Sequence, residues 1–106
     1  MKEIIKYLNS FDFSKPEVCI ILGSGLSSFQ AEIKNKIIVD YDNIPGFLKT
    51  SVEGHKGRFI FGTVNKTPVM CADGRFHYYE GYSFNQVGII VNVFSLFNPN
   101  VCIITN

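Results

Sequence analysis

The last quarter of this chain carries no charge, which limits where it can lie in a folded protein. All 10 Lys and Arg and all 9 Asp and Glu lie at or before Glu80, so residues 81–106 are uncharged. A membrane-spanning helix needs about 20 predominantly apolar residues, and polar residues interrupt this stretch. The interrupting residues are Asn85, Gln86, Asn92, Asn98, Pro99 and Asn100. We therefore expect the stretch to be buried in protein and not to cross a membrane.

A helix is predicted in the first part of the uncharged stretch. Ser83 followed by Gln86 has the form of a capping box, and apolar residues then recur at helical spacing as far as Phe97. Asn98 and Pro99 are expected to end the helix. Because apolar residues occur on nearly all of its sides, the helix needs cover on more than one face.

The β-branched run Val101–Thr105 is typical of a strand that is buried on both faces of a parallel sheet. Such a strand normally continues into a loop and a covering helix. The sequence ends one residue later, at Asn106, so we expect further residues of the same domain to follow.

The rest of the chain predicts short helical and strand segments of a single domain, without internal repeats. A run of five apolar residues predicts a strand, and Asn65-Lys66 between two strand patterns predicts a two-residue hairpin loop. The predicted elements are a helix over Lys2–Asn9, strands over Val18–Leu22 and Lys36–Tyr41, a Pro45-Gly46 turn, and hairpin strands over Arg58–Val64 and Thr67–Ala72.

Composition excludes several functions. A formal charge of +1 lacks the basic surface that non-specific nucleic-acid binding requires. Cys19, Cys71 and Cys102 lie far apart in apolar runs, with no C-x-x-C pair, which favours buried thiols in a reducing compartment over disulfides or metal ligands. The first residues mix both charge signs and show no signal peptide, so we expect a cytoplasmic protein.

Two kinds of segment could bind an anion. The predicted strand Val18–Leu22 runs directly into Gly23-Ser24-Gly25, where glycines permit close approach of a ligand to the backbone. Both His and both Arg of the chain lie in two other segments, Gly54–Arg58 and Gly74–His77. A forked guanidinium, imidazole donors, a serine hydroxyl and backbone N–H groups together would form an oxyanion pocket.

Several alternatives remain open from the residues alone. Arg58 opens a hairpin strand, which favours a solvated or ion-paired role over ligand binding. A dinucleotide-binding loop would place Ser28 where the third glycine belongs and use Asp40 or Asp42 for the ribose, although the link to the second strand is short. A phosphate loop of the G-K-S/T type fails because no Lys follows Gly23 before Lys34. A non-catalytic module that binds an anion, or that associates with itself through the apolar helix, is a further alternative.

Four segments, taken in order, resemble the trimeric purine nucleoside phosphorylases. They are Ile20–Leu26, Gly54–Arg58, the specific string Gly74–Tyr82, and Ile104–Asn106. The resemblance covers nearly the whole chain. It implies an α/β, three-layer nucleoside phosphorylase-like fold with a mixed, partly barrel-like central sheet, of which residues 1–106 form the N-terminal part of a single domain.

The resemblance also implies an activity and the residues that perform it. The activity is phosphorolysis of purine ribonucleosides and 2′-deoxyribonucleosides in purine salvage, giving free base and pentose 1-phosphate. Residue by residue, Ser24, His55, Arg75 and His77 match the family's phosphate ligands, His77 is assigned to catalysis as well, and Tyr79 matches the aromatic that covers the ribose. Inorganic phosphate is the co-substrate, with no metal and no organic cofactor, and the full-length protein is expected to be a homotrimer.

Some positions depart from the family pattern. Ser27 stands where a Gly is usual, and Glu53 and Asp73 add negative charge beside the anion site, which is expected to weaken phosphate binding by repulsion. In this family the residues that recognise the purine lie beyond the position of Asn106. The chain is therefore expected to carry the phosphate half of the site and to be inactive alone.

Overall fold

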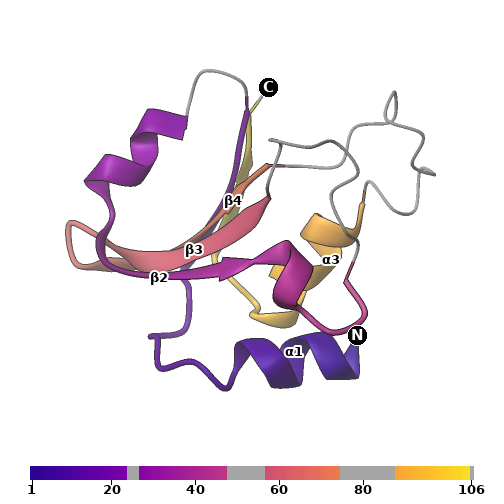
Figure 1. Cartoon of the computed structure of the whole chain (residues 1–106). Helices are drawn as coiled ribbons and strands as arrows, with labels where there is room; N and C mark the ends of the chain where they lie inside the picture. The colour runs from indigo at the N-terminus through magenta and orange to yellow at the C-terminus, as the bar shows by residue number, and fades with distance from the viewer. Residues whose placement is uncertain (24–26, 48–56, 75–87, 106) are drawn as a thin grey trace.

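A mixed five-stranded sheet forms the centre of the computed structural model, which describes residues 1–23, 27–47, 57–74 and 88–105 (Figure 1). The strands are β1 (Val18–Leu22), β2 (Lys34–Asp40), β3 (Arg58–Val64), β4 (Thr67–Asp73) and β5 (Val101–Ile104), in the order β2-β3-β4-β1-β5. Strand β1 is parallel to both β4 and β5, whereas β3 is antiparallel to β2 and β4. The predicted α/β class with a mixed sheet is confirmed; barrel-like curvature stays a prediction.

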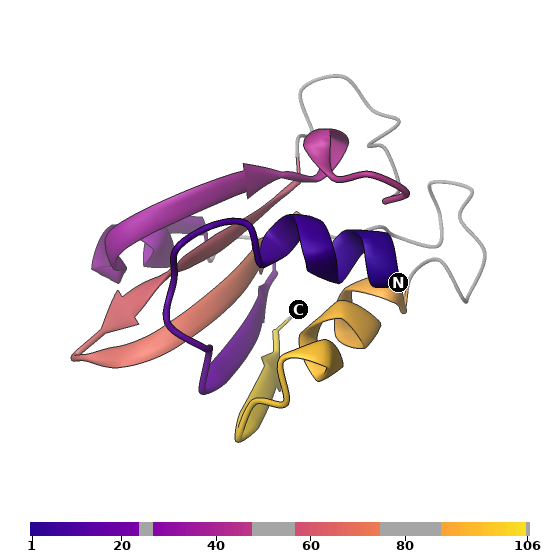
Figure 2. The ribbon, with the colours of Figure 1, turned by 90° about the horizontal axis from the view of Figure 1, so that it is seen from below.

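Helices cover the sheet unequally. Helices α1 (Lys2–Leu8) and α3 (Ile89–Leu96) lie on the same face, as Figure 2 shows. The 3₁₀ helix η1 (Ser27–Glu32) lies on the other side of the sheet (Figure 1), and a second one, η2 (Tyr41–Asn43), follows β2. The sheet thus has the middle position of a three-layer arrangement.

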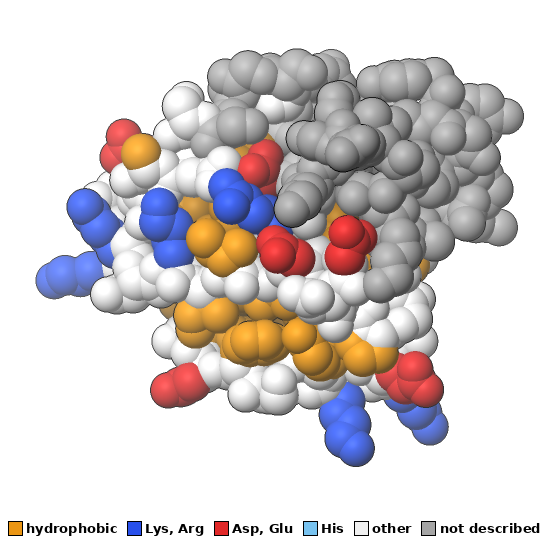
Figure 3. Space-filling model, viewed as in Figure 1, with side chains coloured by type: hydrophobic (Ala, Val, Ile, Leu, Met, Phe, Trp, Pro, Cys, Tyr) orange, Lys and Arg blue, Asp and Glu red, His pale blue; other side chains and the backbone are white. Residues whose placement is uncertain are grey.

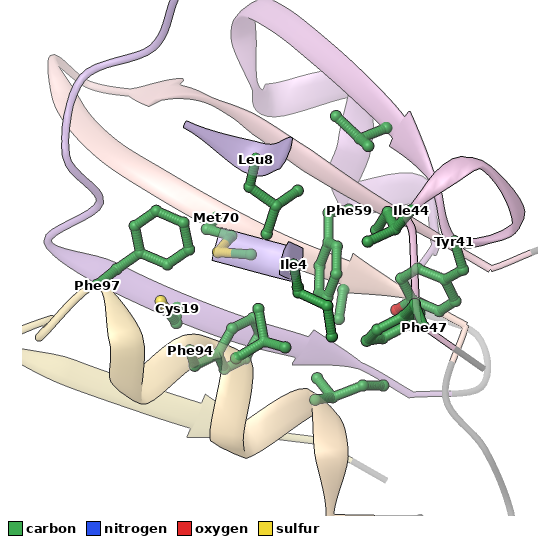
Figure 4. Packing of buried hydrophobic residues seen from close by; sticks show 14 of the residues in the cluster. Ile4, Leu8, Cys19, Tyr41, Ile44, Phe47, Phe59, Met70, Phe94 and Phe97 are labelled. Carbon is green, nitrogen blue, oxygen red and sulfur yellow. The ribbon is translucent and has the colours of Figure 1, made fainter. Parts of the chain in front are cut away.

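The alternation of side chains along β3 builds a core on each face of the sheet. Phe59 and Phe61 point into the larger cluster beneath α1 and α3, which Figure 4 shows, while Ile60 between them joins the smaller cluster with Ile33. Aromatic rings fill the larger cluster: the Phe61 and Phe97 ring centroids are 6.0 Å apart. The sheet is therefore held by apolar contacts on both faces.

The hairpin and the first strand form as predicted. β1 has the predicted bounds, and β3 and β4 flank Asn65 and Lys66, whose φ angles of 50° and 70° are those of a tight hairpin turn. The predicted Pro45-Gly46 turn is also present, with φ of 76° at Gly46. Strand β2 begins two residues earlier and ends one residue earlier than predicted, because Tyr41 starts η2.

Helix α3 ends where predicted and begins later. Phe97 caps its C-terminus and Asn98 follows with a φ of 50°, as the Asn98-Pro99 signal indicates. Its N-cap is Gly88, so the predicted start at Ser83 is wrong for this helix, and Ser83 itself lies outside the described residues. Glycine is a poor residue inside a helix and an acceptable N-cap, which explains the later start.

The last strand, β5, is parallel as predicted, but it is not buried on both faces. All four of its residues are exposed, Val101 to 49% and Ile104 to 61%. The physical reason is that β5 is the last strand of the described sheet, with β1 as its one neighbour among the described strands. Val91 and Leu96 of α3 are exposed as well, which agrees with the prediction that this helix needs cover on a second face.

The described helices are all too short or too polar to span a membrane. The three cysteines are free: Cys19 and Cys71 are buried as predicted, whereas the prediction is wrong for Cys102, which is exposed because it lies on edge strand β5. Burial raises the pKa of Cys19, and that of Cys71, from 9.0 to about 12.

The buried thiols make stability fall at alkaline pH. Because the folded pKa values exceed those of the unfolded chain, their contribution is complete below about pH 8.5 and is lost as the pH rises toward 12. We expect the free energy of unfolding to fall by at most about 1.4 kcal/mol per pH unit for each thiol. Urea unfolding at about pH 8 and about pH 10 measures this difference.

One cysteine variant and one control isolate the effect. Cys19→Ala should reduce the loss of stability between the two pH values, whereas Thr63→Val, which changes no titratable group, should leave it as in the unmodified chain. An equal loss in Cys19→Ala and in the unmodified chain would show that the buried thiol is not its source.

Candidate functional site

The segments that carry the predicted site residues leave the sheet at one edge. Leu22 at the end of β1 pairs with Asp73 at the end of β4, and Ile21 pairs with Ile104 near the end of β5. Strand β3 runs the opposite way, so its first residue, Arg58, also pairs with Asp73. Neighbouring strands lie about 4.8 Å apart, so these four strand ends span roughly 15 Å.

The predicted ligands themselves, Ser24, His55, Arg75, His77 and Tyr79, lie outside the described residues. Their convergence therefore stays a prediction. The structure describes the residues that adjoin them in the chain: Gly23 precedes Ser24, Gly74 precedes Arg75, and Gly57 follows His55 by two positions. We call Gly23, Gly57 and Gly74 the three stems.

Thr105 ties the first stem to the end of β5. The backbone N–H of Gly23 donates to Thr105 Oγ1 at 2.6 Å, and the same hydroxyl donates to the carbonyl of Ile21 at 2.7 Å. The backbone N–H of Thr105 donates to that carbonyl as well, at 3.1 Å. Thr105 thus fixes the point at which the glycine loop leaves β1.

Tyr41 contacts the other two stems. Its hydroxyl donates to the carbonyl of Gly74 at 2.6 Å, and its backbone N–H donates to the carbonyl of Gly57 at 3.0 Å. Burial, followed by the charge of Asp73, raises the pKa of Tyr41 well above its usual value. The phenol therefore remains a proton donor at any physiological pH.

A polar cluster of Arg58, Asp73 and Gln30 lies at the same edge. Arg58 Nε is 3.4 Å from Asp73 Oδ2, which also accepts a hydrogen bond from Gln30 Nε2 at 2.8 Å. Arg58 Nη2 donates to Gln30 Oε1 and closes the cluster. The predicted ion-pair role of Arg58 is confirmed, and the pairing offsets the negative charge of Asp73 that was expected to repel phosphate.

Reasoning from the sequence singled out neither Tyr41 nor Gln30 as a site residue. Tyr41 follows a mostly exposed strand and Gln30 lies in a short helical segment, and neither belongs to a motif that marks a site. Only the antiparallel pairing of β2 with β3 brings Tyr41 beside Gly57. Within the described ranges, no group of three His, Cys, Asp or Glu side chains is placed to hold a metal ion.

Comparison with known proteins finds similarity to the N-terminal portion of one group of enzymes. No protein-family model matches the chain. The purine nucleoside phosphorylase of Mus musculus is 41% identical over 101 residues, which cover 95% of this chain and 35% of that protein. Purine nucleoside phosphorylase 1 of Geobacillus stearothermophilus is 41% identical over 93 residues, covering 88% and 34%. The chain is homologous to the N-terminal portion of the purine nucleoside phosphorylases.

Solved structures of purine nucleoside phosphorylases share the fold. The Schistosoma mansoni enzyme in complex with a monocyclic inhibitor superposes with a TM-score of 0.88 at 36% identity, over 99% of this chain and 38% of that one. Isoform 2 from the same organism, in complex with cytosine and ribose-1-phosphate, gives 0.90 at 35% identity, over 99% and 37%. The purine nucleoside phosphorylase family uses phosphate as co-substrate and no cofactor.

The resemblance drawn from four sequence segments is thus confirmed at the level of the family. The chain spans about 35% of the length of the mouse purine nucleoside phosphorylase. The match in fold covers nearly all of this chain, including the strands that carry the three stems.

Thr105→Val tests the anchor of the first stem. Valine keeps the branched shape but removes the hydroxyl that accepts from Gly23 and donates to Ile21. We expect the free energy of unfolding to fall by about 1 kcal/mol, as measured by urea unfolding, because the part-buried N–H of Gly23 loses its acceptor while the Ile21 carbonyl keeps the backbone N–H of Thr105. Thr63→Val, at a half-buried threonine of β3, is the matched control. Equal changes in the two variants would contradict the anchoring role.

Proposed function

We propose that this chain supplies the phosphate-binding half of a site for the phosphorolysis of purine ribonucleosides and 2′-deoxyribonucleosides. The observation that carries the proposal is the meeting of the three stems at one sheet edge, in a chain homologous to purine nucleoside phosphorylases. In open α/β sheets, ligands bind at the carboxyl ends of parallel strands, and β1, β4 and β5 all end here.

The proposed chemistry follows from the residue types. Ser24, His55, Arg75 and His77 would hold one phosphate through hydroxyl, imidazole and guanidinium donors, and Tyr79 would pack against the ribose. As the bond between the sugar and the purine breaks, the purine leaves with the electron pair and takes up a proton. Hydrogen phosphate loses one proton on becoming pentose 1-phosphate, so the proton count balances. The sugar becomes oxocarbenium-like, and a phosphate oxygen forms the new bond to its anomeric carbon.

Phosphate is thus both electrostatic stabiliser and nucleophile. A dianion held beneath the sugar lowers the energy of the developing cation, and its fixed position replaces a bimolecular encounter. His77, as the proposed catalytic residue, would keep the phosphate oriented for this attack. The reaction is complete with inorganic phosphate and the nucleoside.

The purine-binding half would come from polypeptide that corresponds to the rest of the relatives. The mouse relative has about two thirds of its length outside the match, and the exposed residues of β5 and α3 offer an apolar surface for it to cover. We propose that the 106 residues are inactive alone, form the N-terminal part of one domain, and act in cytoplasmic purine salvage. The full-length protein would be a homotrimer.

An activity assay tests both parts of this proposal. The 106-residue chain should not cleave inosine or guanosine with phosphate, because it lacks the purine-binding half. A chimera in which it replaces the matching segment of the Geobacillus stearothermophilus enzyme should release hypoxanthine and guanine only when phosphate is present. Turnover by the 106 residues alone would defeat the claim of inactivity. A folded chimera without phosphorolysis would defeat the proposed reaction.

Arg75→Ala in that chimera tests the phosphate role. Loss of a forked, charged donor should raise the KM for phosphate by at least about tenfold, with a smaller effect on the KM for inosine. Lys66→Ala, in the exposed turn of the β3–β4 hairpin, is the control and should leave both values unchanged. An unaltered phosphate dependence in Arg75→Ala would count against the assignment.

A second candidate function is that of a non-catalytic, self-associating module. The exposed apolar residues of α3 and β5 favour it, because unpaired edge strands with apolar side chains readily pair with another chain. These residues are Val91, Leu96, Val101, Ile103 and Ile104. Size-exclusion chromatography distinguishes the two: a defined dimer without phosphate binding would support the module, and a monomer would contradict it.

The relatives described above are phosphorylases, which favours phosphorolysis over dinucleotide binding.

A further inference from the structure

We propose that Tyr41 is a positioning residue that fixes Gly57 and Gly74 relative to each other, the two points at which the segments with His55 and Arg75 join the sheet. The expected effect on phosphate affinity rests on the proposed function. The contacts of Tyr41 with Gly57 and Gly74 involve described residues alone. Tyr41 touches neither substrate in this account and acts through the backbone of the two stems.

Tyr41 connects the ends of three strands, β2, β3 and β4. Tyr41 directly follows β2, its backbone N–H binds Gly57 just before β3, and its side chain reaches the carbonyl of Gly74 just after β4. Two strand spacings, roughly 10 Å, separate β2 from β4. The backbone pairing of β3 with β4 extends to Arg58 and Asp73, and Tyr41 contacts the next residue on each strand, Gly57 and Gly74.

The two stems are shaped to receive this side chain. A Cβ at Gly57 would overlap Cδ2 and Cε2 of the Tyr41 ring, so any other residue would displace the ring. Gly74 has a φ of 97°, in the region that favours glycine, and this conformation presents its carbonyl to the hydroxyl. The absence of a side chain at both positions is thus a condition for the contact.

The aromatic core holds the ring in place. Tyr41 is only 1% exposed, and its ring centroid lies 4.8 Å from that of Phe59 and 4.9 Å from that of Phe47 (Figure 4). Rings packed at these distances on two sides leave little freedom of rotation. The hydroxyl is therefore placed by the core, and its 2.6 Å hydrogen bond transmits that position to Gly74.

Arg58 and Asp73, which form a cluster with Gln30, adjoin Gly57 and Gly74 in the chain and are less buried than Tyr41. The Arg58 side chain is 34% exposed and that of Asp73 is 18% exposed, so solvent weakens their ion pair. Figure 3 shows acidic and basic side chains next to each other on the face of the molecule that Figure 1 presents. The buried contact of Tyr41 is thus the more rigid of the two connections to β4.

Tyr41→Phe removes the hydroxyl and keeps the ring. We expect amide hydrogen exchange at Arg58 and Gly74 to become about five- to tenfold faster, the change that loss of one buried hydrogen bond predicts. Exchange in the β3–β4 hairpin turn should stay the same. Tyr7→Phe, at a half-buried tyrosine of α1, is the matched control and should change neither region.

Calorimetry with inorganic phosphate, the second measurement, should give a weaker affinity for Tyr41→Phe than for Tyr7→Phe.

Gly57→Ala provides an independent variant. The methyl group of the alanine should push the Tyr41 ring away and make amide exchange at Gly74 faster, as in Tyr41→Phe. In the double variant, the increase in the exchange rate should be smaller than the two single increases combined. If exchange becomes faster only at the stems and the chain binds no phosphate, the positioning role of Tyr41 is supported and the proposed phosphate binding is wrong. The proposal would be overturned if amide exchange at the stems were as slow in Tyr41→Phe as in Tyr7→Phe. It would also be overturned if Tyr41→Phe made exchange faster by the same factor in all parts of the chain. If Tyr41→Phe does not fold, unchanged exchange at Gly74 in Gly57→Ala overturns it.

Discussion

The parallel pairing of β1 with β4 on one side and β5 on the other is the constraint on which the site depends. Because all three strands end at the same edge, residues that are about 50 and about 80 positions from Gly23 in the sequence come to lie next to it. The antiparallel β3 then adds the start of its own strand to this edge, at Arg58. A site with ligands from separate segments needs such an edge, since no local stretch of this chain holds all of the proposed ligands.

Side-chain hydrogen bonds keep the edge in register where the backbone ladder ends. Thr105 holds Gly23, Tyr41 holds Gly74, and Gln30 with Arg58 holds Asp73. Each bond joins residues that are far apart in the chain, so each reduces the freedom of a strand end beside a loop. An edge ordered in this way presents its stems at fixed separations, which is what electrostatic preorganisation of an anion site requires.

Elements with local signals were predictable, and those that depend on neighbours were not. The Asn65-Lys66 turn, β1 and the C-terminal end of α3 follow from turn chemistry, an apolar run and a helix stop signal. The exposure of β5 and of Cys102 has no local signal, because burial depends on what lies beside a strand, and among the described strands only β1 lies beside β5. The proposed ligands came from motif resemblance. Tyr41 escaped notice because its partners are set by register across two strands.

We propose that several segments of the chain bind one inorganic phosphate together at this edge. Nuclear magnetic resonance of the isotopically labelled chain, titrated with inorganic phosphate, can test this binding. We expect the backbone amide signals of Gly23, Gly57 and Gly74 to shift together and saturate along one binding curve, while those of Asn65 and Lys66 stay in place. Shifts that never saturate, or that follow separate curves at the three glycines, would contradict a shared phosphate.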